Sequence, residues 1–184
     1  KSIHLGLVGF IGLVSISSVI AATAPYAGSA GTATFEHKVR GINVRGNMTG
    51  VTSDVKLDLA NISTTTGTVT VPLNNLSTGL GLRDSHTKGE SALNTAKFPN
   101  AIFTLEKLTG GKLTEGASVN TTATGKLTVK GVTKAISAPI KATLKEGKIN
   151  ISTQFKFNPY DFGVKYPGSS DSVTVNVQFV LGSK

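Results

Sequence analysis

The feature that most constrains how this 184-residue chain can fold is an alternation of apolar and polar side chains with a period of two. From Ala33 onward, apolar residues take every second position in one segment after another, as in "VKLDL" at 55–59 and "VTVNVQFVL" at 173–181. Successive side chains of a β-strand point to opposite faces, so this period indicates strands with one apolar and one polar face. About eight such segments occur, and they predict an all-β fold.

Turn signals separate the segments at spacings typical of antiparallel hairpins, which predicts a sandwich or an up-and-down barrel. The signals are Gly110-Gly111, Glu115-Gly116, Lys130-Gly131, Glu146-Gly147 and Pro167-Gly168. Aromatic residues make up only 6% of the chain, and most inward positions are Val, Ile, Leu or Ala. A barrel of this kind is either filled by its own side chains or holds one small apolar ligand. The small inward residues favour a cavity.

The first 24 residues have a different pattern, which predicts an export signal. Lys1 gives a positive start, an apolar run extends from Ile3 to Ile20, and small residues follow. This order is that of a secretory signal peptide. The run is about long enough to span a bilayer, but its Gly and Ser content and its alanine-rich exit favour cleavage over a retained anchor. We therefore expect a cleaved signal at 1–24, a barrel domain at 25–184, and a periplasmic or secreted bacterial protein.

Composition and charge narrow the classes of function. The chain has no Cys, which excludes disulfides and thiolate metal sites. Its formal net charge is +9, a balance that attracts nucleic acid, anionic lipid or an acidic ligand. The lysines of the second half are spaced singly, without a basic run, and no aromatic–arginine stacking platform accompanies them. This spacing is typical of solvated strand faces, so no nucleic-acid partner is expected.

One connection carries the densest cluster of polar chemistry. In "LRDSHTKGESALNTAKFPNAIF", residues 82–103, the side chains Arg83, Asp84 and His86 occur within four positions. Asp84 or Ser85 is expected to cap a short helix, because both side chains accept hydrogen bonds from the first turn. The cluster is therefore predicted to lie between two strands as a structural connection, where Arg83 and Asp84 form an ion pair or a capping arrangement.

The same cluster could instead be interpreted as a metal site or as an active site, which are more specific functions than a structural connection. His86 shares a helix face with Glu90 but not with Asp84, and two ligands are fewer than the three or four that a zinc site normally needs. A site that adds His37 is a speculative alternative. A Ser-His-Asp hydrolase needs a positioned nucleophile, and the chain has no Gly-x-Ser-x-Gly elbow. We expect neither metal nor catalysis, and keep a lipid-modifying enzyme that uses Arg83, Asp84 and His86 as an alternative.

Four stretches are similar to one known family. They are "FEHKVRGINVRGNMTG" at 35–50, "LSTGLGLRDSHTKGESALNTAKFPNAIFTLEKL" at 76–108, "ATGKLTVKGVTKAISAPI" at 123–140 and "FKFNPYDFGV" at 155–164. The third is the most specific. In this order they resemble the YceI-like family, polyisoprenoid-binding proteins with a lipocalin-like barrel, over about residues 33–181. The chain departs from the pattern at Thr87, Ala92 and Leu93, where the family has bulkier residues, so the expected cavity differs in shape near that connection.

The resemblance implies an eight-stranded antiparallel lipocalin-like barrel with one or two short helices and an apolar interior. Such an interior would hold a long amphiphile without a cofactor: a polyprenyl compound, an isoprenoid quinone or a fatty-acid derivative. Each buried methylene contributes about 0.8 kcal/mol, so a few isoprene units would offset the cost of association without a specific hydrogen bond. A site of that kind leaves no polar motif in a sequence.

The expected function is that of an exported protein that sequesters or carries a polyisoprenoid or related lipid, without catalysis. The alternatives are a stress-related envelope protein that binds an isoprenoid quinone or a fatty-acid amide, a structural protein with a filled barrel, and the enzyme described above. An encounter with a membrane surface is included among the partners, and the oligomeric state, a dimer included, is left open. The inward residues predicted to line the cavity are Val55, Leu57, Val69, Val71, Phe103, Leu105, Leu127, Val129, Ile140, Ile151, Phe155, Val175, Val177 and Phe179.

Overall fold

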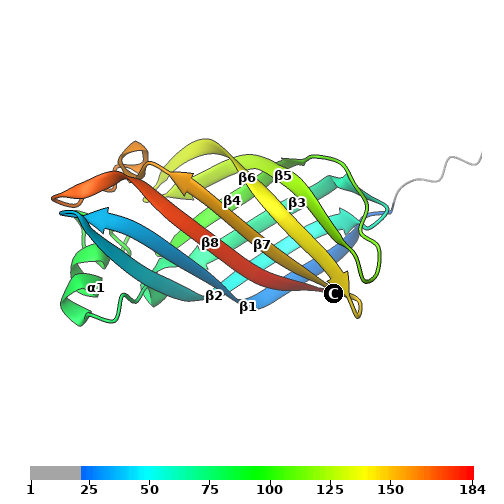
Figure 1. Ribbon diagram of the computed structural model, residues 1–184, viewed down its shortest axis with the longest axis horizontal. Coiled ribbons are helices and arrows are strands. Elements are labelled where there is room, and N and C mark those ends of the chain that lie inside the picture. The colour runs from blue at the N-terminus through cyan, green and yellow to red at the C-terminus, as the bar shows by residue number, and fades with distance from the viewer. Residues whose placement is uncertain (1–21) are drawn as a thin grey trace, which may run out of the picture.

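The structure, a computed structural model, describes residues 22–184 and shows eight antiparallel strands closed into a barrel. Each strand pairs with the next along the chain, and β1 pairs with β8 to complete the ring (Figure 1). The strands are β1 (Ala24–Val39), β2 (Ile42–Asp58), β3 (Asn61–Pro72), β4 (Asn100–Leu108), β5 (Ser118–Val129), β6 (Val132–Lys145), β7 (Lys148–Phe157) and β8 (Ser169–Ser183). The helical elements are η1 (Leu73–Asn75), α1 (Gly81–Lys88) and η2 (Pro159–Phe162). The predicted barrel with short helices is confirmed.

The alternation read from the sequence sets the two faces of the barrel wall. In β2, Val55 and Leu57 are buried, while Lys56 between them is exposed. The singly spaced lysines of later strands, such as Lys126 and Lys141, are exposed on the outer face as expected. A period of two therefore separates an apolar interior from a basic, solvated exterior.

Three hairpins turn through two residues that both have positive φ, the geometry of a type I′ turn. They are Arg40-Gly41 (51° and 78°), Lys130-Gly131 (50° and 76°) and Glu146-Gly147 (53° and 70°). Glycine takes the second position in each, because this left-handed conformation is unfavourable for residues with a Cβ. The twist of such a turn matches that of the flanking strands. The Lys130 and Glu146 turns were predicted from sequence, and the Arg40 turn adds a third.

β1 begins at Ala24, well before the start predicted near Ala33. Its pairing with β2 shifts register between Gly28 and Gly31, and Ala30 has a φ of 63°. An extra residue in one strand breaks the period of two, so the alternation becomes regular only beyond this bulge. The expected signal at 1–24 lies outside the described residues, apart from its final part from residue 22. Within residues 22–184, no helix has the length and apolar character needed to cross a bilayer.

The two ends of the barrel are built differently (Figure 1). At one end, short turns join β2 to β3 and β6 to β7, and residues 109–117 run between β4 and β5. We call this the Leu113 end. At the other end lie α1, the β1–β2 and β5–β6 turns, and residues 158–168 between β7 and β8. We call this the α1 end, and it carries most of the chain that is not strand.

Candidate ligand-binding cavity

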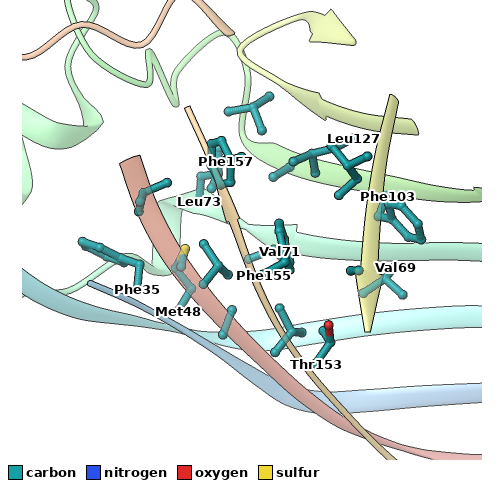
Figure 2. Close-up of a pocket in the computed structure, with 18 of the residues that line it drawn as sticks. Phe35, Met48, Val69, Val71, Leu73, Phe103, Leu127, Thr153, Phe155 and Phe157 are labelled. Atoms are coloured by element: carbon teal, nitrogen blue, oxygen red, sulfur yellow. The ribbon is translucent and has the colours of Figure 1, made fainter. Parts of the chain in front are cut away.

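An apolar cavity of about 890 Å³ occupies the interior of the barrel, and its wall takes residues from all eight strands. Figure 2 shows Val69 and Val71 of β3, Phe103 of β4 and Phe155 of β7 around the same space. The volume lies within the range of natural small-molecule sites, about 300–1,000 Å³. The sequence left open whether the barrel is filled or hollow, and the structure is hollow.

All fourteen residues predicted to line a cavity lie on its wall. They are spread over β2 to β8, and the closed ring brings them together from positions as distant in sequence as Val55 and Phe179. Most are only half-buried, since the cavity leaves part of each side chain uncovered. That they contact a ligand stays a prediction.

Sequence reasoning missed other parts of the wall. Phe35 and His37 lie on it and continue the alternation that starts at Ala33, so this signal was sufficient to find them. Leu73 and Leu76 also lie on it, 5% and 3% exposed, but they belong to the irregular segment after β3. No period exists in such a segment, and its inward residues become known only from the fold.

The groups on the wall that can carry charge near neutral pH are all bases. Among the described residues that form it, none is Asp, Glu or Lys, and the basic side chains are His37, Arg40, Arg83 and His86. These four belong to the last part of β1, the turn after it, and α1. They therefore gather at the α1 end, while the rest of the wall is apolar apart from a few hydroxyls such as Thr121 and Thr153.

The cavity opens at the α1 end. The wall residues whose side chains are exposed to solvent are Arg40, Ile42, Ser85, His86, Ser91 and Pro167. All of them lie on the β1–β2 hairpin, on α1 and the turn that follows it, or on the β7–β8 connection. We call the opening that these three segments border the mouth.

The Leu113 end is closed by side chains. Leu113 is 8% exposed and packs in a cluster with Ile62 and Ile149, which are 2% and 0% exposed. Backbone hydrogen bonds fix the loop that carries Leu113: its own N–H donates to the Leu59 carbonyl at 2.7 Å, and the Ile62 N–H donates to the Gly111 carbonyl at 3.0 Å. The cavity therefore has one described opening and a sealed base.

A threonine holds α1 at the mouth. The Arg83 guanidinium donates to the Thr78 hydroxyl from Nε at 2.8 Å and to the Thr78 carbonyl from Nη2 at 2.9 Å. The Thr78 N–H donates to the Asp84 carboxylate at 2.8 Å, and the Thr78 hydroxyl donates to the same oxygen. These bonds fold the segment before α1 back onto the first turns of the helix.

Two expectations for this cluster are wrong. The residue that precedes α1 is Leu80, and it provides no side-chain cap, so neither Asp84 nor Ser85 takes that role. Asp84 lies inside the helix and bonds the chain before it instead. Arg83 and Asp84 form no ion pair with each other among the described residues, because both are engaged by Thr78. These hydrogen bonds from Thr78 lower the pKa of Asp84, since they favour the charged carboxylate.

His86 is exposed at the mouth and forms no hydrogen bond with Arg83 or Asp84 in the described structure. Asp84 is not part of the cavity wall. The enzymatic alternative requires the three side chains to reach one another inside the cavity, and they are not arranged in this way. In the same described part of the chain, no group of three His, Asp or Glu side chains is placed to hold a metal ion.

Comparison with known proteins shows the family of this barrel. A model of the YceI-like domain matches residues 23–181, from the start of β1 almost to the end of β8. The chain belongs to the YceI-like family. It is 40% identical over 75 residues to a UPF0312 protein of Yersinia pestis, and 36% identical over 108 residues to one of Pseudomonas savastanoi pv. phaseolicola. These matches cover 41% and 53% of this chain, but only 36% and 52% of the relatives' own lengths.

Solved structures share the YceI-like fold at low sequence identity. BcnA of Burkholderia cenocepacia superposes with a TM-score of 0.71 at 17% identity, covering 82% of this chain and 95% of that one. A polyisoprenoid binding domain from Saccharophagus degradans gives 0.70 at 13% identity, covering 86% and 98%. The YCEI protein of Campylobacter jejuni gives 0.66 at 23% identity, covering 78% and 86%. At these identities the likeness concerns the fold.

Proposed function

We propose that this YceI-like protein is an exported carrier that holds a polyisoprenoid or a related long lipid in its barrel, without chemical conversion. The observation that carries the proposal is the cavity of about 890 Å³, which has an apolar wall, a sealed base at Leu113 and a single described mouth. The Saccharophagus degradans neighbour of similar fold is itself described as a polyisoprenoid binding domain.

The shape of the interior suits a long, thin ligand. β2 has 17 residues and β1 has 16, so a strand of this length runs roughly 50 Å at about 3.3 Å per residue. Figure 1 shows the resulting barrel as longer than it is wide. An extended prenyl chain would lie along the axis and contact every strand, and its polar head group would remain at the mouth, beside Arg40, Arg83 and His86.

The direct test is extraction of the protein after purification from its native host, followed by mass spectrometry of the lipids. We expect one class of long-chain amphiphile at up to one molecule per chain. If no lipid co-purifies and the protein takes up neither a prenyl alcohol nor an isoprenoid quinone, the proposal fails. A quinone or a fatty-acid amide in the extract would support the carrier while changing its ligand.

A matched pair of variants locates the ligand. Val71 lies on the cavity wall, whereas Thr70 beside it does not. Val71→Trp fills part of the cavity, so we expect bound lipid to fall at least several-fold without a loss of thermal stability, because the new ring is buried against apolar atoms. Thr70→Trp is the control and should retain wild-type lipid content. Equal loss in both variants would place the ligand elsewhere.

Export is proposed from residues 1–24 alone. Expression of the full sequence in a bacterium with a periplasm, followed by fractionation and N-terminal sequencing, tests it. We expect the protein outside the cytoplasm with a new N-terminus in the alanine-rich region at 21–24. Recovery of the uncut chain in the cytoplasm would contradict this part of the proposal and leave lipid binding untouched.

A further inference from the structure

The most exposed large apolar side chains of the described protein lie at the α1 end. Ile42, Leu80 and Leu82 are 68%, 58% and 74% exposed. The other exposed residues of this kind within the strands are Ile102, at the start of β4, and Val180 in β8, at 37% and 42%. A side chain at about 40% sits within a strand surface, whereas one above half projects from its surroundings. Ile42 follows the β1–β2 turn, and Leu80 and Leu82 lie at the start of α1.

The same end carries an excess of positive charge. Residues between strands at the α1 end include six basic and three acidic side chains: Arg40, Arg83, Lys88, Lys97, Lys130 and Lys165 against Asp84, Glu90 and Asp161. At the Leu113 end the corresponding residues are one basic and two acidic: Lys112 against Glu115 and Glu146. The molecule is therefore polarised along its axis, with projecting apolar groups and cations at one end.

From this arrangement we infer that the α1 end docks on an anionic lipid bilayer. Apolar side chains that project beside cations insert between the head groups, while lysine and arginine bind the lipid phosphates. Ile42 connects the docking face with the wall of the cavity, because it is both 68% exposed and part of that wall. Apolar surface therefore continues from the docking face into the barrel, and a docked molecule presents its mouth to the bilayer.

Docking is separable from the proposed carrier function. It depends on the surface at Ile42, Leu80 and Leu82 and on the nearby cations, and it does not depend on which molecule the cavity holds. A carrier could fail to bind vesicles, and a vesicle-binding protein could contain no lipid. The charge excess favours a bilayer with anionic head groups over an uncharged surface, and this preference is what the experiment measures.

The test is co-sedimentation of residues 25–184 with two kinds of vesicle, because the apolar run at 3–20 would itself bind lipid in the full chain. One contains equal parts of phosphatidylcholine and phosphatidylglycerol, and the other contains phosphatidylcholine alone. We expect binding to the first that weakens as salt is added, and little binding to the second. Absence of binding to the anionic vesicles, or equal binding to both, would overturn the inference.

A double variant and its control identify the face that binds. Ile42→Ser with Leu82→Ser removes two projecting side chains, and we expect roughly tenfold weaker binding or more, since each loses its burial in the bilayer. Val180→Ser, near the end of β8 and away from α1, is the control and should bind as the wild type does. Equal weakening in the double variant and in this control would show non-specific adsorption and overturn the inference.

A second set of variants tests the contribution of the cations to vesicle binding. Lys88→Gln with Lys165→Gln removes two cations of the α1 end, and we expect about fivefold weaker binding for each lysine that approaches the surface. Lys112→Gln with Lys148→Gln, near the Leu113 end, is the control and should have no effect. If instead the wild type is a dimer that Ile42→Ser with Leu82→Ser dissociates, and it binds no vesicles, the face is an interface between copies and the inference fails.

Discussion

The two ends of this barrel use the same residue types for opposite purposes. At the Leu113 end, Leu113 and Ile149 are buried and seal the interior, and the loop over them is held by backbone hydrogen bonds. At the α1 end, Ile42 and Leu82 project into solvent around an opening. The apolar composition of an end therefore does not reveal whether that end of the barrel is closed or open. The difference lies in whether the connection packs its apolar side chains into the interior, as Leu113 does, or leaves them exposed, as at Leu82.

The largest expected effect on stability comes from comparing the same type of substitution, Ile to Ala, at each end of the barrel. Ile149→Ala should lower the free energy of unfolding by about 2–5 kcal/mol, because it leaves a cavity in a packed cluster. Ile42→Ala, the same chemical change on a side chain 68% exposed, should change it by no more than about 0.5 kcal/mol. Urea unfolding of both variants measures the contrast. Similar losses would mean that the α1 end is packed as tightly as the base.

The second prediction concerns the plug itself. Leu113→Ala should cost about 2 kcal/mol or more of unfolding free energy, since its side chain is 8% exposed. It also thins the seal of the cavity, so a bound fluorescent fatty acid should dissociate faster than from the wild type. Stopped-flow displacement measures this rate. A loss of stability with an unchanged rate would show that Leu113 supports the fold but does not retain the ligand.

A smaller effect is expected at Ser53, in β2 near the base. Its hydroxyl oxygen is buried and has no hydrogen-bond partner among the described residues. Ser53→Ala removes this unsatisfied group, so we expect the protein to become more stable by up to about 1 kcal/mol. Thermal unfolding monitors the change. Destabilisation would indicate that water reaches this part of the barrel, and the base would then be less dry than its packing implies.

The smallest effect concerns pH at the mouth. The pKa of Asp84 is lowered in the folded state by its hydrogen bonds from Thr78, so its stabilising contribution is present above the ordinary aspartate pKa, about 4. It is lost as the pH falls through the lower folded pKa. The protection factors of the α1 amides, which correct for the intrinsic pH dependence of exchange, should therefore fall in acid. Asp84→Asn should lower these protection factors at neutral pH and weaken their acid dependence, and an identical dependence would exclude Asp84 as the cause.

Sequence reasoning predicted the wall of the cavity better than its ends. Alternation places Val69 or Phe155 inward because the strand period is two regardless of context. Whether such residues fill a barrel or line a void depends on the ring they form together, which no local pattern contains. Thr78 had no signal either, since its role arises only when the chain before α1 folds back onto Arg83.

The cluster at Arg83, Asp84 and His86 shows the other limit. Its residues were correctly placed on a connection between strands, but the expected cap and ion pair are absent from the described structure because Thr78 binds both charged side chains. A hydrogen bond with one hydroxyl in a specific geometry cannot be read from spacing alone. The closure of the Leu113 end was not predicted for a related reason. Leu113 lies in a glycine-containing loop whose apolar and polar residues do not alternate.

The pairing of β1 with β8 also has a consequence for how the protein is made. Ala33 pairs with Val177, so the first and last strands must meet before the ring exists. Contacts this distant in sequence form slowly, and the folding chain has β1 as an open edge until β8 pairs with it. Open edges recruit other chains and promote aggregation. Pairing of β8 therefore determines whether the chain forms a closed barrel or remains an open sheet, and a factor that shields β1 until then would raise the yield.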